Sequence, residues 1–311
     1  MASLPTVSVI VPVRNGGKLL ERCLRSVLGQ NYPRDCFEIL VVDNGSTDGS
    51  ADIASALGLA PVFESQPGAG LARNRGLGEA TGDIVAFADA DCEVSPAWIT
   101  ALVGALREAD AVMARIEPFP GGNRFARSRA TLHGLYLGEC RRLDRENRLD
   151  RLDTANAAAW RRVLDEVGGF HPEIFPGEDR ELGARIAERG GRVKFAEEPS
   201  VLHHYEQGIL SSMRKAEDRG RMWAKLPDLL SADILKRRFA DITKLLATAA
   251  TLAPPEGRRR LRRRFRMHLA AAAVRPGFDN CLHHFREAER LATLLGIVRG
   301  FDGQSREQTK R

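Results

Sequence analysis

Apolar runs and amphipathic segments alternate along the first part of the chain and predict strands and helices in turn. Residues 7–13, VSVIVPV, form a continuous apolar and β-branched run, which is typical of a strand buried on both faces. Apolar residues at helical spacing follow over 19–28, and further short strands are expected at 38–42, 62–63 and 84–88. This alternation predicts an α/β fold with a mostly parallel sheet flanked by helices.

Polar and glycine-rich segments between these blocks predict where helices begin. Ser46 or Thr47 is expected to cap a short helix, and a further helix is expected over 71–80. Ser95 followed by Pro96 has the pattern of an N-cap and a first helical residue. Each of these helices would connect two strands of the sheet.

The order loosens after residue 114, where helices and strands no longer alternate regularly. Helices are expected over 124–148 and 160–167, another begins at Glu178 and ends before Gly190, and extended segments are expected at 193–196 and 201–204. The remaining chain is predicted to be mainly helical.

The net charge of +6 conceals two regions of opposite sign. Residues 208–311 contain 23 Lys and Arg against 11 Asp and Glu, a balance of +12, so residues 1–207 carry 24 against 30, a balance of −6. A compositional shift of this size marks a boundary. We therefore predict two domains, 1–207 and a basic, mainly helical 208–311.

The basic region contains RRRLRRRFR at residues 258–266, seven arginines in nine residues. A basic amphipathic helix can contact an anionic membrane peripherally, and the same composition fits an arginine face that is only solvated. Nucleic acid is not expected as a partner, because aromatic residues are not interleaved with the arginines to stack on bases. The membrane and solvated interpretations both stay open.

Several features bear on the compartment. No segment approaches the ~18 uninterrupted apolar residues of a membrane span. The first residues lack a basic region and run directly into the first strand, so no signal peptide is expected. The five cysteines are scattered without metal-ligand spacing, which fits a reducing environment. The expected location is the cytoplasm, with peripheral contact at the inner face of the membrane.

Acidic residues follow predicted strands or open a predicted helix in a fixed order. Asp43 ends the strand at 38–42, Asp89 and Asp91 follow the strand at 84–88, and Asp179 lies at the helix start after Glu178. The carboxyl ends of parallel strands form the edge where ligands bind. Two residues apart on an extended backbone, Asp89 and Asp91 would face one side and suit Mg²⁺ or Mn²⁺. Each alone could be an ordinary turn aspartate, but their order favours a site.

Four stretches together resemble the inverting family-2 glycosyltransferases of the GT-A fold. They are SVIVPVRNGGKLLERCLRSVLGQNYPRDCFEILVVDNGSTDGS, GLARNRGLGEATGDIVAFADADC, TANAAAWRRVLDEVGGF and GEDRELGARI. The resemblance implies a nucleotide-diphosphate sugar donor, with a UDP-sugar as the first expectation, a divalent metal, and direct displacement at the anomeric carbon. It also implies a glycan or lipid-linked acceptor, and places donor binding and catalysis in residues 1–207.

The resemblance assigns roles to individual residues of the nucleotide pocket. Pro12 and Asp43 would line the base and ribose pocket, with Asp43 accepting a hydrogen bond from the base. Arg73 would lie on a helix that faces the nucleotide. Asp89 would contact the ribose or the metal.

The same resemblance assigns the metal and the base. Asp91 would bind the metal directly, and Asp179 would be the catalytic base that accepts the proton of the acceptor hydroxyl. His203 would approach the metal or diphosphate, with His204 beside it as an alternative. The helix dipole would lower the pKa of Asp179 and neighbouring Glu178 would raise it, so the sequence does not determine the outcome.

Other interpretations stay open at this point. Arg73 could be a solvated helix arginine, Glu178 a helix cap, His203 a satisfied histidine and Asn156 a turn residue. A sugar-nucleotide nucleotidyltransferase is the alternative enzyme, with VPVRNGGK as a weak phosphate loop. A non-catalytic nucleotide-sugar-binding protein would be favoured if Asp179 lay far from the metal pocket.

Overall fold

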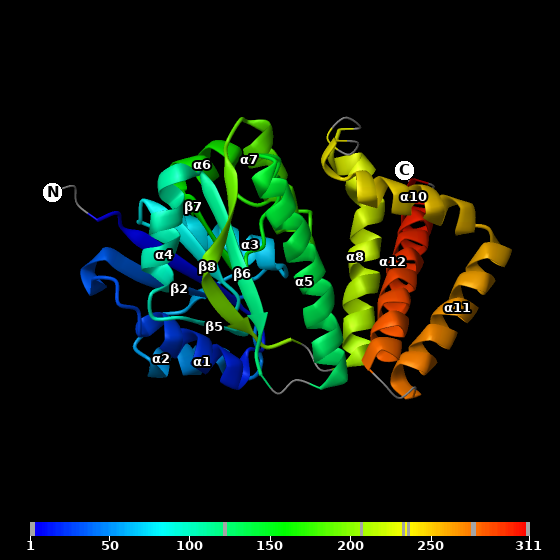
Figure 1. Ribbon diagram of the computed structural model, residues 1–311, viewed down its shortest axis with the longest axis horizontal. Coiled ribbons are helices and arrows are strands. Elements are labelled where there is room, and N and C mark those ends of the chain that lie inside the picture. The colour runs from blue at the N-terminus through cyan, green and yellow to red at the C-terminus, as the bar shows by residue number, and fades with distance from the viewer. Residues whose placement is uncertain are drawn as a thin grey trace. The chain divides into compact units, whose positions relative to one another are not determined.

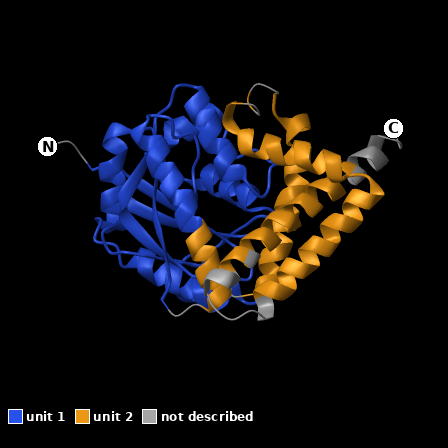
Figure 2. Cartoon of the chain, turned by 45° about the vertical axis from the view of Figure 1, so that its right-hand side comes forward, with its two compact units in different colours: residues 1–120, 133–204 blue, residues 121–132, 205–311 orange. Residues whose placement is uncertain are grey.

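The computed structural model of the chain describes residues 4–120, 123–205, 208–231, 234, 237–274 and 278–308. It divides into two compact units, one of residues 1–120 and 133–204 and one of residues 121–132 and 205–311 (Figure 2). The division at 207/208 drawn from charge stays a prediction. The side chain of Cys281 lies outside the described residues, and the other four cysteines are free thiols.

The first unit contains an eight-stranded sheet with strand order β3-β2-β1-β4-β7-β6-β8-β5 (Figure 1). Its strands are β1 Val7–Val13, β2 Phe37–Asp43, β3 Val62–Phe63, β4 Ile84–Ala88, β5 Cys92–Val94, β6 Ala111–Pro118, β7 Asn156–Trp160 and β8 Val193–His203. Strand β1 pairs in parallel with β2 and β4, while β7 runs antiparallel to β4 and β6. The predicted α/β class with a mostly parallel sheet is confirmed.

Helices flank this sheet (Figure 1). They are α1 Gly17–Leu28, α2 Ser50–Ala56, α3 Ala69–Glu79, α4 Trp98–Ala105, α6 Arg161–Val167 and α7 Glu178–Glu188, with short 3₁₀ turns η1 Arg34–Cys36 and η2 Leu106–Glu108. Helix α1 shows why they form, because its apolar positions repeat at helical spacing and Leu20, Cys23, Leu24 and Val27 are buried. Helix α5, Arg124–Arg145, contributes residues to both units.

Two predicted helix starts are wrong. Helix α2 begins at Ser50 after Gly49, whose φ of 79° suits glycine, so neither Ser46 nor Thr47 caps it. The Ser46 hydroxyl instead accepts a hydrogen bond from the Asn15 amide at 2.9 Å. Helix α4 begins at Trp98, after a turn over the residues where the Ser-Pro pattern predicted the helix itself. In both cases the residues predicted to start the helix lie in the loop before it.

The second unit is helical, as predicted. Its helices are α8 Ile209–Leu229, α10 Ala240–Leu252, α11 Pro255–Val274 and α12 Phe278–Gln308, joined by the first part of α5. Helices α8 and α12 approach closely at glycines: a Cβ atom on Gly296 would lie 1.9 Å from the Glu217 carbonyl oxygen, and one on Gly220 2.0 Å from that of Thr293. Among the described residues, no helix combines the length and apolar character needed to cross a bilayer.

Candidate active site

The end of β2 forms one side of the candidate site. Asp43 is buried, and its Oδ1 accepts a hydrogen bond from the Ser46 amide at 2.8 Å. Pro12 lies beside it on β1, opposite Val42 in the parallel register. Asn44, which the sequence did not single out, bonds the Gln66 carbonyl at 2.7 Å and the Gly68 amide at 2.7 Å. This buried amide holds the glycine-rich loop next to Asp43, where the predicted base and ribose pocket would lie.

Asp89 and Asp91 lie on a tight turn between β4 and β5. The Cys92 amide closes the turn on the Asp89 carbonyl at 3.0 Å. The expectation of an extended backbone at this pair is therefore wrong, because the chain reverses here to start β5. The Asp91 side chain is 40% exposed at the carboxyl edge of the sheet, the edge where ligands bind in open parallel sheets.

Strand β8 brings a histidine to this turn. The antiparallel β5–β8 register sets His203 opposite Cys92, and His203 Nε2 lies 3.5 Å from Asp91 Oδ1. His204, the first residue after β8, makes different contacts. Its Nε2 lies 2.7 Å from Glu93 Oε1 and its ring stacks on Phe119 at 3.9 Å. Of the two adjacent histidines, His203 is the one beside Asp91.

The donor atoms at this turn fit a divalent metal. In the described part of the chain, Asp91, Cys92 and His203 have ligand atoms within 4.8 Å of one another. A carboxylate oxygen and an imidazole nitrogen suit Mn²⁺, and a carboxylate also suits Mg²⁺. Burial, followed by the charges of Asp89 and Asp91, raises the pKa of the Cys92 thiol well above its usual range. In the absence of a metal ion the thiol is therefore protonated.

Arg73 connects the Asp89 turn to the start of α7. It is 3% exposed, and its two terminal nitrogens donate to Glu178 Oε1 at 2.7 Å and Asp89 Oδ1 at 2.8 Å. Its guanidinium also lies 5.7 Å from the centre of the Phe170 ring. Burial opposes the charge of Arg73, but Asp89 and Glu178 raise its pKa overall. Arg73 is thus no solvated arginine, and its proximity to the nucleotide stays a prediction.

Asp179 lies at the first turn of α7, next to Glu178. Its Oδ1 accepts a hydrogen bond from the Arg180 amide at 2.7 Å. Burial, then the neighbouring charges of Glu178 and Asp153, raise the pKa of Asp179 to about 8, although Arg73 and the Arg180 amide act in the opposite direction. Burial and the two neighbouring carboxylates therefore outweigh the two influences that lower the pKa of Asp179.

Sequence reasoning missed a second carboxylate near Asp179. Asp153, in the segment before β7, lies 3.1 Å from His133 Nε2 on α5. Burial would raise the pKa of Asp153, but the hydrogen bond and charge of His133 lower it overall. Tyr136, one turn further along α5, stands edge-on to His133 with 5.8 Å between ring centres. No motif joins these residues, and only the path of α5 brings them together.

Asn156 of the TAN motif has a structural role. It is fully buried, its Nδ2 donates to the carbonyls of Arg115 and Pro199 at 2.8 and 2.9 Å, and its Oδ1 accepts from Trp98 Nε1 at 2.9 Å. These bonds connect β6, β7, β8 and α4 beneath the site. They leave the side chain no direct part in binding a sugar.

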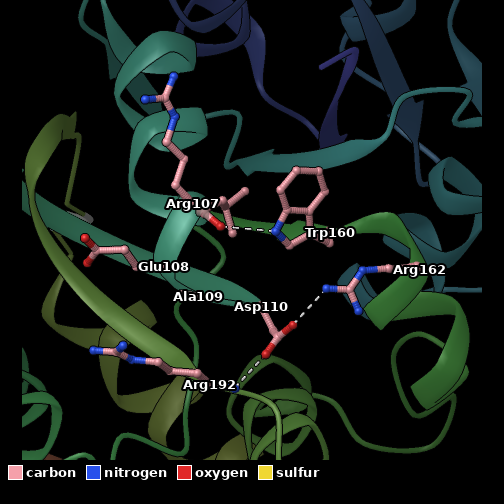
Figure 3. Close-up of a pocket in the computed structure, with 8 residues that line it drawn as sticks. Arg107, Glu108, Ala109, Asp110, Trp160, Arg162 and Arg192 are labelled. Atoms are coloured by element: carbon pink, nitrogen blue, oxygen red, sulfur yellow. Dashed lines mark hydrogen bonds and ion pairs between the residues drawn. The ribbon is translucent and has the colours of Figure 1, made fainter. Parts of the chain in front are cut away.

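A pocket of about 510 Å³ lies at the opposite end of the strands (Figure 3). It is lined by residues at the start of β6 and the end of β7, among them Asp110, Trp160 and Arg162. Asp110 bonds Arg162 at 3.1 Å and the Arg192 amide at 2.9 Å, as the dashed lines show. Its carboxylate is satisfied within the fold, and the pocket is separate from the acidic site.

Comparison with known proteins identifies relatives of this arrangement. The family model described as glycosyl transferase family 2 matches residues 8–168. The glycosyltransferase AglE of Haloferax volcanii is 31% identical over 249 residues, which cover 77% of this chain and 79% of that protein.

Solved structures share the fold. The mannosyltransferase PcManGT from Pyrobaculum calidifontis, in complex with GDP-Man and Mn²⁺, has a TM-score of 0.66 at 23% identity and covers 96% of this chain and 88% of its own. TarS 1–349 of S. aureus, in complex with UDP-GlcNAc, has a TM-score of 0.55 at 17% identity and covers 96% and 92%. At these identities the likeness establishes the GT-A fold.

Proposed function

This chain belongs to glycosyl transferase family 2 and is a glycosyltransferase, and we propose that it works by a metal-dependent, inverting mechanism. The proposed reaction moves a sugar from a nucleotide-diphosphate donor, with a UDP-sugar as the first choice, to a hydroxyl group. The proposed acceptor is a glycan or a lipid-linked glycan. The proposed location is the cytoplasm, at the inner face of the membrane.

One observation carries this proposal: Arg73 joins the carboxylate turn after β4 to the helix start that bears Asp179. The 2.8 Å bond to Asp89 and the 2.7 Å bond to Glu178 are both made by the same buried guanidinium. The segment that we propose binds the metal and the segment that we propose carries the base are therefore joined by one side chain. A binding protein without catalysis would not require a carboxylate of raised pKa at this junction.

Asp91 and His203 are the residues that we propose hold the metal. Mn²⁺ or Mg²⁺ at this position would neutralise charge on the departing diphosphate. Asp89 is the other carboxylate predicted to reach the metal or the ribose, and Arg73 fixes its orientation through Oδ1. The Asp43 carboxylate and Pro12 lie at the end of the neighbouring strands, where the base and ribose of the donor would bind.

Asp179 is the proposed catalytic base. It accepts the proton of the acceptor hydroxyl while that oxygen forms its bond to the anomeric carbon. The bond from this carbon to the diphosphate oxygen breaks on the opposite face, and the nucleoside diphosphate leaves with the electron pair. One such displacement inverts the anomeric centre. A raised pKa makes Asp179 a stronger base than an exposed aspartate, and a positioned base contributes roughly 10²–10⁴-fold to the rate.

Asp153 has a supporting role in this proposal. Its charge, held by His133 at 3.1 Å, is one cause of the raised pKa of Asp179. Two carboxylates whose pKa values are moved apart by their surroundings mark an acid–base site. We therefore propose Asp153 as a positioning residue that keeps Asp179 basic, and not as a second nucleophile.

The donor is proposed from the chemistry of the site and from the relatives. PcManGT was solved with GDP-Man and TarS with UDP-GlcNAc, so one fold accepts different bases and sugars.

The two alternative functions, a nucleotidyltransferase and a non-catalytic binding protein, make different predictions. A nucleotidyltransferase would consume a sugar phosphate and a nucleoside triphosphate. A binding protein would bind the donor without turnover.

Calorimetry with UDP, GDP and their sugar derivatives, with and without Mn²⁺, tests the proposal. Asp91→Ala should lose the Mn²⁺-dependent part of nucleotide affinity, whereas Asp179→Asn should keep it. Unchanged Mn²⁺-dependent affinity in Asp91→Ala would refute the metal assignment. Near-normal transfer by Asp179→Asn would place the base elsewhere, and Glu178 and Glu181 would be tested next.

A further inference from the structure

Helix α11 presents an exposed face made almost entirely of arginine. Its inward positions are apolar, because Leu261 belongs to one buried cluster of the helical unit and Phe265 packs against two. Six arginines of the helix are exposed, namely Arg259, Arg260, Arg262, Arg263, Arg264 and Arg266. At 100° per residue these six cover more than half of the circumference of the helix.

None of these six side chains has an ion-pair partner within the residues that the structure describes. Arginines on other helices behave differently: Arg142 pairs with Glu139 and Glu146, both at 2.7 Å. Helix α11 contains one acidic residue, Glu256, at its start. Arg258 is the exception among the arginines, because it donates to the Ala253 carbonyl next to the start of the helix.

The charge of helix α11 equals the net charge of the whole chain. With seven arginines and one glutamate, α11 carries +6, which equals the net charge of all 311 residues, so the rest of the chain is neutral in sum. Like charges four residues apart destabilise a helix, and Arg259–Arg263, Arg260–Arg264 and Arg262–Arg266 are such pairs. A surface of phosphate groups would remove this repulsion.

We propose that the exposed arginine face of α11 docks on an anionic membrane surface. Guanidinium groups bind phosphate through two parallel hydrogen bonds, and their long stems let them reach headgroups from a helix that lies flat. Met267 is 59% exposed between the arginines and offers one apolar side chain to the interface. Single-stranded nucleic acid is disfavoured, because Phe265 packs inward and leaves no aromatic platform for bases.

Vesicle binding by the full chain tests this surface without reference to sugar transfer. Sedimentation with vesicles of phosphatidylcholine alone should leave the protein free, whereas replacing about a third of the lipid with phosphatidylglycerol should bind it. Binding should weaken as salt rises, since exposed charges are screened beyond about 8–10 Å at physiological ionic strength. No binding to the acidic vesicles would overturn the proposal.

A matched pair of triple variants distinguishes the effect of the arginine face from the effect of overall charge. Arg259→Gln, Arg263→Gln and Arg266→Gln remove three charges from the face and should weaken binding roughly 100-fold. Arg214→Gln, Lys225→Gln and Lys244→Gln remove three charges from exposed positions of α8 and α10 and should change it less than about threefold.

Two results would contradict the assignment of this face. One is equal loss of vesicle binding in both triple variants, and the other is tighter binding of the parent to an oligonucleotide than to acidic vesicles. Circular dichroism and nucleotide affinity should be unchanged in both variants, which shows that folding and the donor site are intact. Loss of donor binding with normal vesicle binding would instead count against the proposed function alone.

Discussion

Replacing Asp179 by Asn should stabilise the folded protein at pH 8 while removing catalysis. The surroundings raise the pKa of Asp179 from its ordinary value of 3.8 to about 8, with burial as the first cause and Glu178 and Asp153 next. The native state therefore keeps a proton that the unfolded chain releases. The stability that this proton contributes is complete below about pH 4 and is lost as the pH rises through about 8.

The size of the effect follows from the shift. One pKa unit corresponds to about 1.4 kcal/mol, so a shift of about four units sets an upper limit of roughly 5 kcal/mol at pH 8. Asp179 is only partly buried, and water screens part of the unfavourable charge, so we expect about 1–3 kcal/mol. Asparagine has the same shape and no charge to bury. The variant should therefore gain this amount over the parent at pH 8 and almost nothing near pH 4.

Urea unfolding across this pH range measures the difference. The midpoint of Asp179→Asn should stay nearly level with pH while that of the parent falls, with similar m values. Asp165→Asn on α6 is the control, because that carboxylate is 65% exposed and its replacement should not change the pH dependence. A parent and an Asp179→Asn variant with parallel pH profiles would refute the reasoning. Turnover of the same variant should fall by about two or more orders of magnitude.

Three further predictions concern the neighbours of the base and the packing of the fold. In the parent, kcat/KM should rise with pH through an apparent pKa of about 8. Asp153→Asn removes a charge that raises the pKa of Asp179, so it should lower that apparent pKa by roughly one unit. An unchanged apparent pKa would show that Asp153 does not act on Asp179. Arg73→Met should lower the free energy of unfolding by about 3–5 kcal/mol because it leaves Glu178 buried without its partner, whereas Arg75→Met, 48% exposed on the same helix, should cost less than about 1 kcal/mol. Gly296→Ala should destabilise the helical unit by more than about 2 kcal/mol, because its Cβ would lie 1.9 Å from the Glu217 carbonyl oxygen. Gly134→Ala, which has open space around it on α5, should be neutral or stabilising by about 0.5–1 kcal/mol. Thermal unfolding of the two variants measures both effects.

The strands that sequence predicted well are those with a strong local signal. The bounds predicted for β1, β3 and β4 match the structure, and those of β2 differ by one residue at each end. Strand β7 was missed because NAAAW is rich in alanine and lacks β-branched residues. It becomes a strand through its pairing with β4 on one side and β6 on the other, which a local pattern does not reveal.

The residues of the candidate site could likewise be predicted only in part. The carboxylates at strand ends and the Glu178–Asp179 helix start could be read from their place in the chain. The choice of His203 over His204 could not, because it depends on the β5–β8 register that sets His203 beside Asp91. Asp153 and His133 are far from any motif, and their contact results from the course of α5 past the segment before β7.

The anomeric configuration of the transferred sugar tests the central claim most directly. A donor selected by calorimetry is incubated with the protein and Mn²⁺, and the configuration of the released or transferred sugar is followed by proton NMR before mutarotation. A single displacement assisted by Asp179 predicts that an α-linked donor yields the β-anomer first, and that Asp179→Asn abolishes this signal while nucleotide binding persists. Initial release of the α-anomer by the parent would contradict the inverting mechanism.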